Sequence, residues 1–485
     1  MMRSLFAGVS GLQNHQIRMD VVGNNIANVN TTGYKRSRVN FQDMISQTMS
    51  GAARPTDNKG GVNPKQVGLG MMVATIDTIH TQGSLQTTGN NLDMAISGNG
   101  FFILKDGDKS FYTRAGAFGL DKDGLLVNPA SGFKVQGWVS REVNGEYILN
   151  TAGDPEDITI PLYSKDPARQ TTNIDFKCNL MSQKPIVEDY DALSERERAQ
   201  NTWQSSINVY DNQGNPFETR YTFYKTDVNE WRVRLDVYQI DPENPTMKIQ
   251  VPNDQFSLST DPTEGAGNDA VAGQNEFVLR FDNLGRLSSI SDLDAAGNVL
   301  DTKNAGDLSL NINLNVPGTT PGLPGENINL TMNMGIAGQV STDENIGVTQ
   351  FASGFSTKPF RQDGYGMGYL EGFQIDDTGS ITGVYSNGNN RTLAQLALAN
   401  FSNVQGLEKA GETNFVYSNN SGEPDISPPG VQGKGKIVAG TLEMSNVDLA
   451  DQFTDMIVTQ RGFQANSKTI QTSDQMIQEL LTLKR

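Results

Sequence analysis

The chain has 485 residues, a net charge of −17 and 19% charged residues, with 50 glycines and a single cysteine. A length of this order suggests about three domains. The acidic balance argues against nucleic-acid binding, which needs a clustered basic face. One cysteine excludes an internal disulfide framework, and many glycines with few charges favour an all-β middle over an α/β enzyme.

The first predicted element is a helix over residues 4–29, ended by the turn-forming run 30–33. Its apolar positions are Leu5, Val9, Leu12, Met19 and Ile26. They keep the 4–3 spacing of a coiled-coil seam. Because only one narrow stripe is apolar, the helix fits neither a buried core position nor a membrane span.

Residues 31–75 are predicted to be a linker or extended segment, since 51–70 are rich in Gly, Pro and Asn. Short strands are then expected, including 94–96 and 101–105. The clearest β pattern is the alternation of apolar and polar residues over 231–237. With 207–210 and 217–225 it predicts a three-stranded meander.

A second amphipathic helix is predicted to start near residues 446–448, with Ser445 or Asn446 as its N-terminal cap. Its apolar positions are Leu449, Phe453, Met456, Phe463, Ile470, Ile477 and Leu481. We call the twelve apolar residues of both helices the terminal stripes. Such stripes at opposite ends of one chain indicate a polymer subunit, in which the ends pair and the stripes form the contact between copies.

The predicted fold is mainly β with α-helical termini paired as a coiled-coil-like layer, followed by nested β-rich domains. The predicted division is 1–30 and 440–485 for the terminal helical polymerisation domain, 31–75 for the linker, 76–160 and 350–439 for a first β-domain, and 161–349 for an outer β insertion of one or two subdomains.

Signals for catalysis are weak, and we expect no enzyme activity, cofactor or metal. The two histidines, His15 and His80, are interpreted as polar surface residues. The basic cluster Lys35, Arg36 and Arg38 is interpreted as a solvated turn. No signal peptide and no membrane span are expected, because the first twelve residues hold no continuous apolar stretch.

Residues 23–35 read Gly-Asn-Asn-Ile-Ala-Asn-Val-Asn-Thr-Thr-Gly-Tyr-Lys and resemble the N-terminal signature of the bacterial flagellar rod and hook proteins. Residues 91–102, 445–449 and 460–468 resemble further motifs of this family. The family motif is carried by Asn24, Asn25, Ile26, Asn28, Thr32, Gly33, Tyr34 and Lys35. The asparagines either stop the helix or bond the backbone of neighbouring subunits, and both interpretations stay open.

Within the family that the chain resembles, rod proteins are expected to consist of the ends and the first β-domain, without a long insertion. The predicted insertion 161–349 therefore favours a resemblance to the hook proteins. The distal rod protein or a hook-associated axial protein is the alternative inside the family, and a surface adhesin the alternative outside it. The hook interpretation implies a flexible helical tube that acts as a universal joint between motor and filament.

The resemblance also implies partners and a location. The partners would be copies of the same chain, the rod protein, the hook cap, the hook–filament junction proteins and the flagellar export apparatus. The hook would be extracellular, or periplasmic in a protein of the spirochete type. No nucleic acid and no membrane insertion are expected.

Cys178 has two interpretations. A lone cysteine is usually a small buried hydrophobe. The resemblance to spirochete hook proteins implies instead a lysinoalanine crosslink between subunits, with Lys165 as the amine and Asn179 assisting by hydrogen bonding. Lys177 is excluded as the amine because adjacent residues of a strand point to opposite faces.

Overall fold

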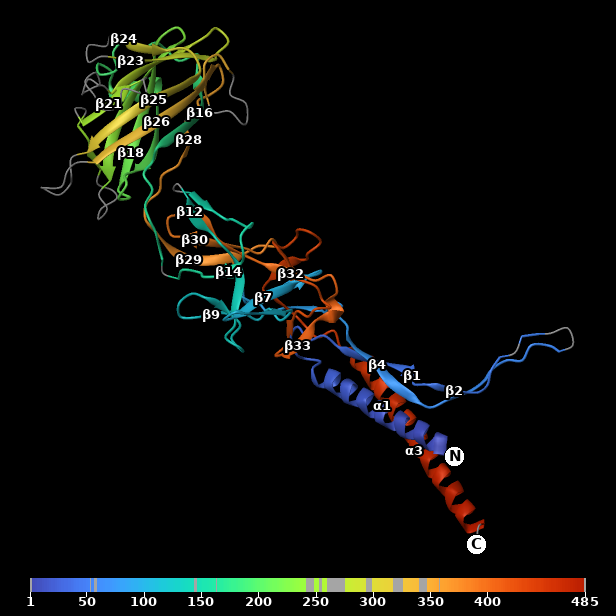
Figure 1. Cartoon of the computed structure of the whole chain (residues 1–485). Helices are drawn as coiled ribbons and strands as arrows, with labels where there is room; N and C mark the ends of the chain where they lie inside the picture. The colour runs from blue at the N-terminus through green and yellow to red at the C-terminus, as the bar shows by residue number, and fades with distance from the viewer. Residues whose placement is uncertain are drawn as a thin grey trace. The chain divides into compact units, whose positions relative to one another are not determined.

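The computed structural model describes the chain except residues 1, 53, 56–58, 144–145, 163, 241–247, 253–254, 260–274, 294–298, 317–325, 340–346, 357 and 484–485. The chain divides into two compact units. Unit 1 comprises Met1–Tyr163, Glu371–Val384 and Asn390–Arg485, and unit 2 comprises Ser164–Leu370 and Tyr385–Asn389. The described residues are mainly β-strands with a long helix near each terminus, as predicted (Figure 1).

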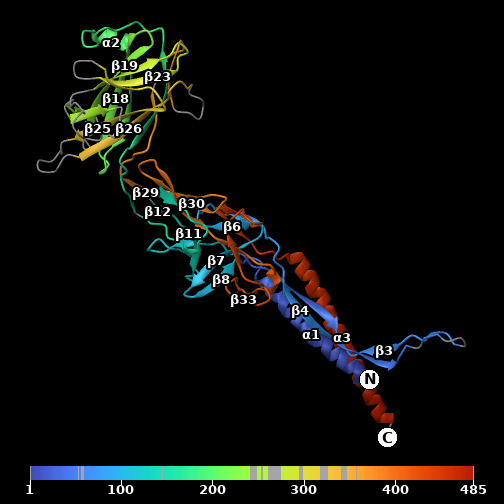
Figure 2. The same cartoon turned by 45° about the horizontal axis from the view of Figure 1, so that its top comes forward.

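In unit 1, helices α1 (Met2–Ala27) and α3 (Leu449–Leu483) lie side by side (Figures 1 and 2). Both lie within two or three residues of the predicted bounds. The predicted cap of α3 is wrong. Asp448 caps it, because its Oδ1 accepts the backbone N–H of Ala450 at 2.8 Å and of Asp451 at 3.4 Å.

The predicted linker is instead a β-hairpin. β1 (Ser37–Asp43) pairs antiparallel with β4 (Met71–Thr78), and β2 (Ser46–Ser50) pairs with β3 (Lys65–Gly68). Every side chain of β2 and β3 is exposed, so no apolar alternation marks them in the sequence. The hairpin contacts α1, since Asn14 Nδ2 donates to the carbonyl of Met71 at 2.6 Å.

The β part of unit 1 interleaves segments from both halves of the chain: β36 pairs with β6, β37 with β5, and β34 with β8. The strands are β5 (Leu85–Thr87), β6 (Met94–Ser97), β7 (Phe101–Asp106), β8 (Lys109–Thr113), β9 (Gly119–Leu120), β10 (Leu126–Val127), β11 (Lys134–Val139), β12 (Arg141–Val143), β13 (Glu146–Ile148), β14 (Glu156–Asp157), β30 (Ser380–Tyr385), β31 (Asn390–Leu396), β32 (Leu398–Asn400), β33 (Glu408–Gly411), β34 (Asn414–Val416), β35 (Asp425–Ser427), β36 (Lys436–Ala439) and β37 (Thr441–Glu443). Its largest sheet runs β30-β31-β11-β7-β8-β34-β33.

Unit 2 contains two sheets whose side chains share one apolar core. Its elements are β15 (Lys165–Asp166), β16 (Asn173–Met181), α2 (Glu195–Asn201), β17 (Trp203–Tyr210), β18 (Pro216–Asp227), β19 (Glu230–Ile240), β20 (Lys248–Gln250), β21 (Phe256–Ser259), β22 (Glu276–Phe281), β23 (Leu287–Leu293), β24 (Val299–Lys303), β25 (Asp307–Val316), β26 (Glu326–Ile336), β27 (Gly347–Phe351) and β28 (Lys358–Gln362). One sheet follows the order β17-β18-β19-β22-β23-β24, and the other β21-β25-β26-β16-β27 with β28 on β16.

The predicted meander is present as β17-β18-β19, and Trp231, Val233 and Leu235 are fully buried from it. The predicted end of the insertion at residue 349 is too early. Residues 350–370 belong to unit 2, since β28 pairs antiparallel with β16, and β29 (Gly368–Ile375) starts there. Among the described helices, none combines the length and the apolar character that crossing a bilayer requires.

Candidate assembly site

The contact between α1 and α3 depends on glycines. A Cβ on Gly11 would lie 2.5 Å from Nδ2 of Asn466, and a Cβ on Gly8 would lie 2.9 Å from Cγ1 of Ile470. A larger residue at either position would displace these side chains, so glycine favours the close approach of the two helices, because interaxial distance is set by the side chains at the contact.

Polar pairs complete this contact. They are Ser4 Oγ with Ser473 Oγ at 3.3 Å, Arg18 Nη2 with Asp455 Oδ1 at 2.8 Å, and Asn25 Nδ2 with Gln452 Oε1 at 2.9 Å. Their order shows that the helices run antiparallel. On α1 the contacting positions 4, 8, 11, 18 and 25 keep a 4–3 spacing, displaced by one residue from the predicted apolar stripe.

The terminal stripes lie beside this contact, and none of their twelve residues is buried. Leu481 is 64% exposed, Phe453 50% and Val9 40%. Of the stripe residues, Ile470 faces a glycine of α1. The prediction that the helices pair is correct, but the residues that pair them within one chain are small and polar. Several large apolar side chains of the stripes, among them Phe453 and Leu481, are left exposed.

The family motif fastens the base of α1. Asn25 is buried, and its Nδ2 donates to the carbonyl of Ser37 at 2.8 Å in addition to Gln452. Its Oδ1 accepts the Tyr34 hydroxyl at 3.2 Å and the Ser37 backbone N–H at 3.0 Å. One amide thus joins α1, the segment after it and α3, and its hydrogen bonds are formed inside one chain.

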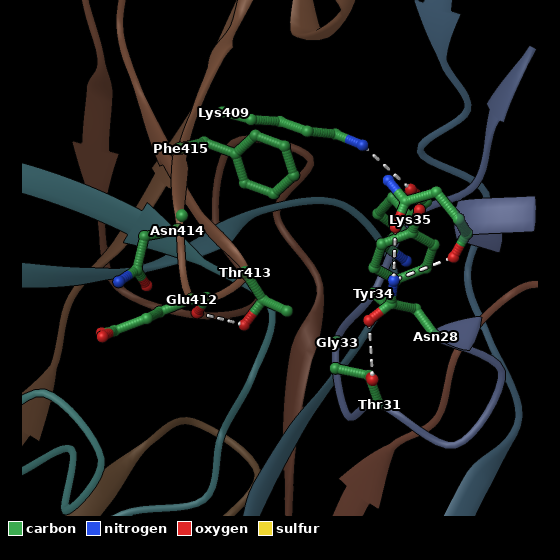
Figure 3. Close-up of a pocket in the computed structure, with 12 residues that line it drawn as sticks. Asn28, Thr31, Gly33, Tyr34, Lys35, Lys409, Glu412, Thr413, Asn414 and Phe415 are labelled. Carbon is green, nitrogen blue, oxygen red and sulfur yellow. Dashed lines mark hydrogen bonds between the residues drawn. The ribbon is translucent and has the colours of Figure 1, made fainter. Parts of the chain in front are cut away.

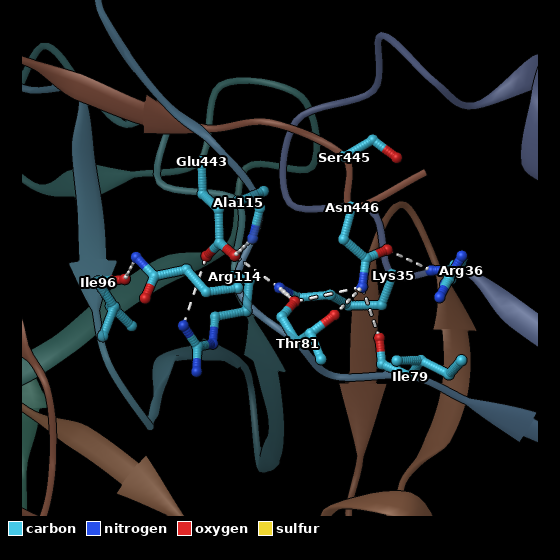
Figure 4. Close-up of polar contacts among 12 residues, drawn as sticks. Lys35, Arg36, Ile79, Thr81, Ile96, Arg114, Ala115, Glu443, Ser445 and Asn446 are labelled. Atoms are coloured by element: carbon cyan, nitrogen blue, oxygen red, sulfur yellow. Dashed lines mark hydrogen bonds and ion pairs between the residues drawn. The ribbon is translucent and has the colours of Figure 1, made fainter. Parts of the chain in front are cut away.

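Lys35 forms a buried charge cluster with Glu443 and Arg114 (Figure 4). Lys35 Nζ lies 2.6 Å from Glu443 Oε1, and Arg114 Nη1 lies 3.4 Å from Oε2. Burial lowers the pKa of Lys35, and Glu443 opposes this shift. The interpretation of Lys35 as part of a solvated turn is wrong, because its side chain is 1% exposed. The cluster ties both ends of the chain to the β part of unit 1.

Two further contacts hold the same junction. Gly33 has φ +68°, and a Cβ there would lie 2.5 Å from the backbone nitrogen of Ala115, which excludes other residues. Asn446 accepts the backbone N–H of Arg36 at 2.8 Å and donates to the carbonyl of Ile79 at 2.8 Å (Figure 4). Asn446 therefore joins the segments at Arg36 and Ile79 by hydrogen bonds and does not cap the helix.

The remaining motif residues stop the helix locally. Asn28 Nδ2 donates to the carbonyl and the side chain of Asn24, both at 2.8 Å, and Thr31 Oγ1 donates to Asn28 Oδ1 at 3.1 Å. Ile26 and Thr32 are half-buried beside them. These bonds support the helix-stop interpretation of the asparagines.

A hollow of about 270 Å³ lies between this turn and the hairpin β33–β34 (Figure 3). Tyr34, Lys409 and Phe415 line it. His80 lies close by, with its ring centroid 5.2 Å from that of Phe415. The interpretation of His80 as a surface residue is wrong: burial, then Lys35, Arg114 and Lys409, lower its pKa to about 4.

The structure does not bring Cys178 and Lys165 together within one chain. Cys178 is 6% exposed in the core of unit 2, as the buried-hydrophobe interpretation predicts. Lys165 lies on β15 and pairs with Tyr369 of β29, whereas Cys178 lies on β16 and pairs with Val348 of β27. The two residues therefore belong to strands of different sheets.

Asn179 holds the loop that follows β27. Its Nδ2 donates to the carbonyl of Ser353 at 3.1 Å, and its Oδ1 accepts the backbone N–H of Phe351 at 2.9 Å. Among the described residues, no group of three or more His, Cys, Asp or Glu is arranged to hold a metal ion.

Sequence reasoning missed Gly8, Gly11 and Glu443, and it gave Asn446 the wrong role. The two glycines carry a usable signal, since they continue a 4–3 spacing through Ser4 and Arg18. Glu443 and Asn446 lie about 410 residues from their partners, so no local pattern identifies them.

Four segments match sequence profiles of known families. Residues 5–35 match "Flagella basal body rod protein", residues 95–177 "Flagellar hook protein FlgE/F/G D1 domain", residues 179–365 "Flagellar basal body protein FlaE D2 domain", and residues 438–483 "Flagellar basal body rod FlgEFG protein C-terminal".

The chain is 50% identical over 490 residues to the flagellar hook protein FlgE of Treponema pallidum (strain Nichols) and 50% identical over 485 residues to that of Borreliella burgdorferi, with all of each chain covered. It is 28% identical over 486 residues to the flagellar basal-body rod protein FlgG of Bacillus subtilis (strain 168), again over the whole of both chains. The higher identity to the hook proteins favours the hook alternative over the rod alternative.

Proposed function

Since this chain belongs to the family of bacterial flagellar hook proteins, we propose that its terminal stripes form the contact between copies in the hook. The chain is a structural subunit of the flagellar hook and assembles with copies of itself. The family is not an enzyme family. The hook is a helical tube that bends while it transmits torque to the filament.

One observation supports this role for the stripes. The helices already pair through glycines and polar groups, yet large side chains such as Phe453, Phe463 and Leu481 face outward. Each of them contributes roughly 1.5–3 kcal/mol when it is buried. A helix pair of this kind is marginal alone and gains its stability in the tube.

The test replaces outward stripe residues without touching the contact between the helices. The double variant Val9→Ser/Phe453→Ser keeps the free energy of unfolding of single copies within about 0.5 kcal/mol. It raises the protein concentration needed for tube formation at least about tenfold. The control is Tyr417→Ser, which removes an equally exposed aromatic from the β part of unit 1. Tubes that form equally well from all three proteins contradict the proposal.

The junction around Lys35 and Glu443 has a mechanical role in this proposal. Torque passes between the tube wall and the helices through this connection, and buried hydrogen-bonded charges specify one geometry for it. The partners beyond the chain itself are the rod protein, the hook cap, the hook–filament junction proteins and the export apparatus. The 50% identity to hook proteins of Treponema and Borreliella supports a periplasmic hook.

The same likeness supports a covalent link between copies. Cys178 loses its α-proton and its sulfur as hydrogen sulfide, which leaves dehydroalanine. The neutral amine of Lys165 from a neighbouring copy then adds to Cβ, and a proton returns to Cα. Within one chain the two residues lie on strands of different sheets, which supports a link between different copies.

Mass spectrometry of digested tubes tests the link. A joined peptide pair lacking hydrogen sulfide is expected from the native protein and from Lys177→Ala, and none from Lys165→Ala. An intact thiol at Cys178 throughout the tubes excludes it. The distal rod protein remains the second candidate function, favoured only by the full-length match at 28% identity.

A further inference from the structure

A groove of about 320 Å³ lies at the base of the helix pair, between α1, the start of β1 and the first two turns of α3. Its charged lining residues are Arg18, Arg36, Arg38, Asp451 and Asp455, and the buried side chains of Val22 and Val39 form part of its apolar lining. We call it the arginine groove. It combines an apolar surface with guanidinium groups in a chain whose net charge is −17.

Of the three guanidinium groups in this groove, that of Arg18 pairs with Asp455 at 2.8 Å, and those of Arg36 and Arg38 are weakly engaged. Arg36 lies 3.8 Å from its nearest carboxylate, Asp451, and Arg38 lies 3.6 Å from Asp77. Both distances exceed that of a hydrogen bond. Nε of Arg36 is buried and has no hydrogen-bond partner among the described residues. The side chains of Arg36 and Arg38 are 31% and 60% exposed, so an added carboxylate can approach them.

The other end of α3 carries the complementary chemistry. Ser473 contacts Ser4 near the start of α1, and α3 continues to Leu483, past the N-terminal end of α1 in both views (Figures 1 and 2). We call residues 474–483 the overhang. Among the described residues, no hydrogen bond or ion pair joins the overhang to another element.

The overhang is amphipathic. Its apolar face consists of Met476, Ile477, Leu480 and Leu481. At 100° per residue these positions form one continuous arc, with Glu479 next to one edge and Asp474 next to the other. Both carboxylates are exposed. The apolar face and its two acids match the apolar lining of the groove and the two weakly paired arginines, Arg36 and Arg38.

We propose that the overhang of one copy docks into the arginine groove of a second copy, with Asp474 and Glu479 binding Arg36 and Arg38. This docking rests on the proposed function. It identifies the surface of a second copy that would cover the apolar residues at the C-terminal end of α3. Bidentate contact between arginine and carboxylate gives the docking its register.

The geometry excludes docking within one copy. Asp455 lines the groove and Asp474 starts the overhang, and 19 helical residues between them span roughly 30 Å at ~1.5 Å per residue. The two surfaces are different, so the contact is head-to-tail. Head-to-tail contacts that do not close a ring produce an open helical filament, which is the form of a hook.

Charge reversal in the full-length protein tests the proposal. The groove variant is Arg36→Glu/Arg38→Glu and the overhang variant is Asp474→Arg/Glu479→Arg. Each is expected to raise the critical concentration for tube formation, measured by sedimentation, about tenfold or more. An equimolar mixture is expected to recover most of this loss, because each reversed surface then meets a complementary one on the other variant.

The control is Asp106→Arg/Asp108→Arg, which makes the same charge change in the exposed turn between β7 and β8. Circular dichroism confirms that each variant folds. If either variant assembles like the wild type, or if the mixture does not recover assembly, the docking is wrong while the proposed function stands. If the wild type forms no tubes, the proposed function itself fails.

Discussion

In unit 2 the side chains of Trp231, Phe176 and Tyr221 are fully buried in one apolar cluster. Between α1 and α3 the closest contacts involve Gly8 and Gly11 instead. Unit 2 buries these apolar side chains within a single copy. The second region pairs through small and polar groups and leaves its apolar residues outside.

This difference indicates where each region obtains its stability. Hydrophobic burial is the dominant favourable contribution to folding, and unit 2 has it in one chain. Under the proposed function, the helix pair buries its exposed stripe residues when other copies cover them. The contact surface between copies then lies on the region whose apolar side chains are less buried within one chain.

The largest expected effect tests whether unit 2 is stabilised by its own buried apolar core. Trp231→Ala removes a fully buried side chain and is expected to lower the free energy of unfolding of unit 2 by about 3–5 kcal/mol. Urea denaturation followed by fluorescence measures it. Trp203→Ala, at a partly buried position, is the control with a smaller loss. An equal loss of unfolding free energy in both variants would mean that burial of Trp231 adds no more stability than the partly buried Trp203.

Glu443→Gln tests the junction with a comparable effect. It leaves Lys35 and Arg114 buried without a counter-charge, which costs about 3–5 kcal/mol in the stability of unit 1. Thermal unfolding measures the change. Glu412→Gln changes an exposed turn of the same unit and leaves stability unchanged. A loss of stability below about 1 kcal/mol for Glu443→Gln would mean that the charge cluster contributes little to the stability of unit 1.

His80 predicts a pH dependence of unit 1. Its pKa is about 4 in the fold and about 6.5 in an unfolded chain. Between these values the unfolded chain binds a proton that the folded chain excludes. Stability therefore falls as the pH drops from about 6.5 to about 4, by on the order of 3 kcal/mol in total.

His80→Phe abolishes this part of the pH profile, because its ring packs with Phe101 and Phe415 and phenylalanine does not titrate. The chain has two histidines, so His15→Gln isolates the His80 signal in a titration followed by NMR. A His80 pKa near 6.5 contradicts the burial.

The smallest expected effect concerns the close approach of the helices. Gly11→Leu places a side chain where Asn466 lies, at a cost of about 1–3 kcal/mol. Gly23→Leu on the same helix is the matched control, because nothing lies within 4 Å of a Cβ there. Hydrogen exchange of α1 and α3 compares them. Equal protection in the two variants contradicts the glycine contact.

The two helices and the meander of unit 2 were predictable, because their patterns repeat within one element. The register of the helix pair was not. Apolar spacing identified Val9 and Phe453, whereas the contact uses Gly8 and polar residues one position earlier. Apolar periodicity locates the surface that needs covering, and it does not say whether the cover comes from the same chain.

Other features could not be predicted from the sequence, because they depend on residues that are far apart in the chain or on backbone pairing alone. Lys35 is charged and follows a turn, so the sequence suggests a solvated position. Its partner Glu443 lies 408 residues away, and only the fold brings them together. The hairpin containing β2 and β3 escaped because backbone pairing alone defines it.

Oxidative footprinting of side chains in single copies and in assembled tubes tests the central claim most directly. The account predicts that Phe453 and Phe463 are oxidised in single copies and protected in tubes, while Trp231 is protected in both. Equal oxidation of Phe453 and Phe463 in single copies and in tubes would contradict the account.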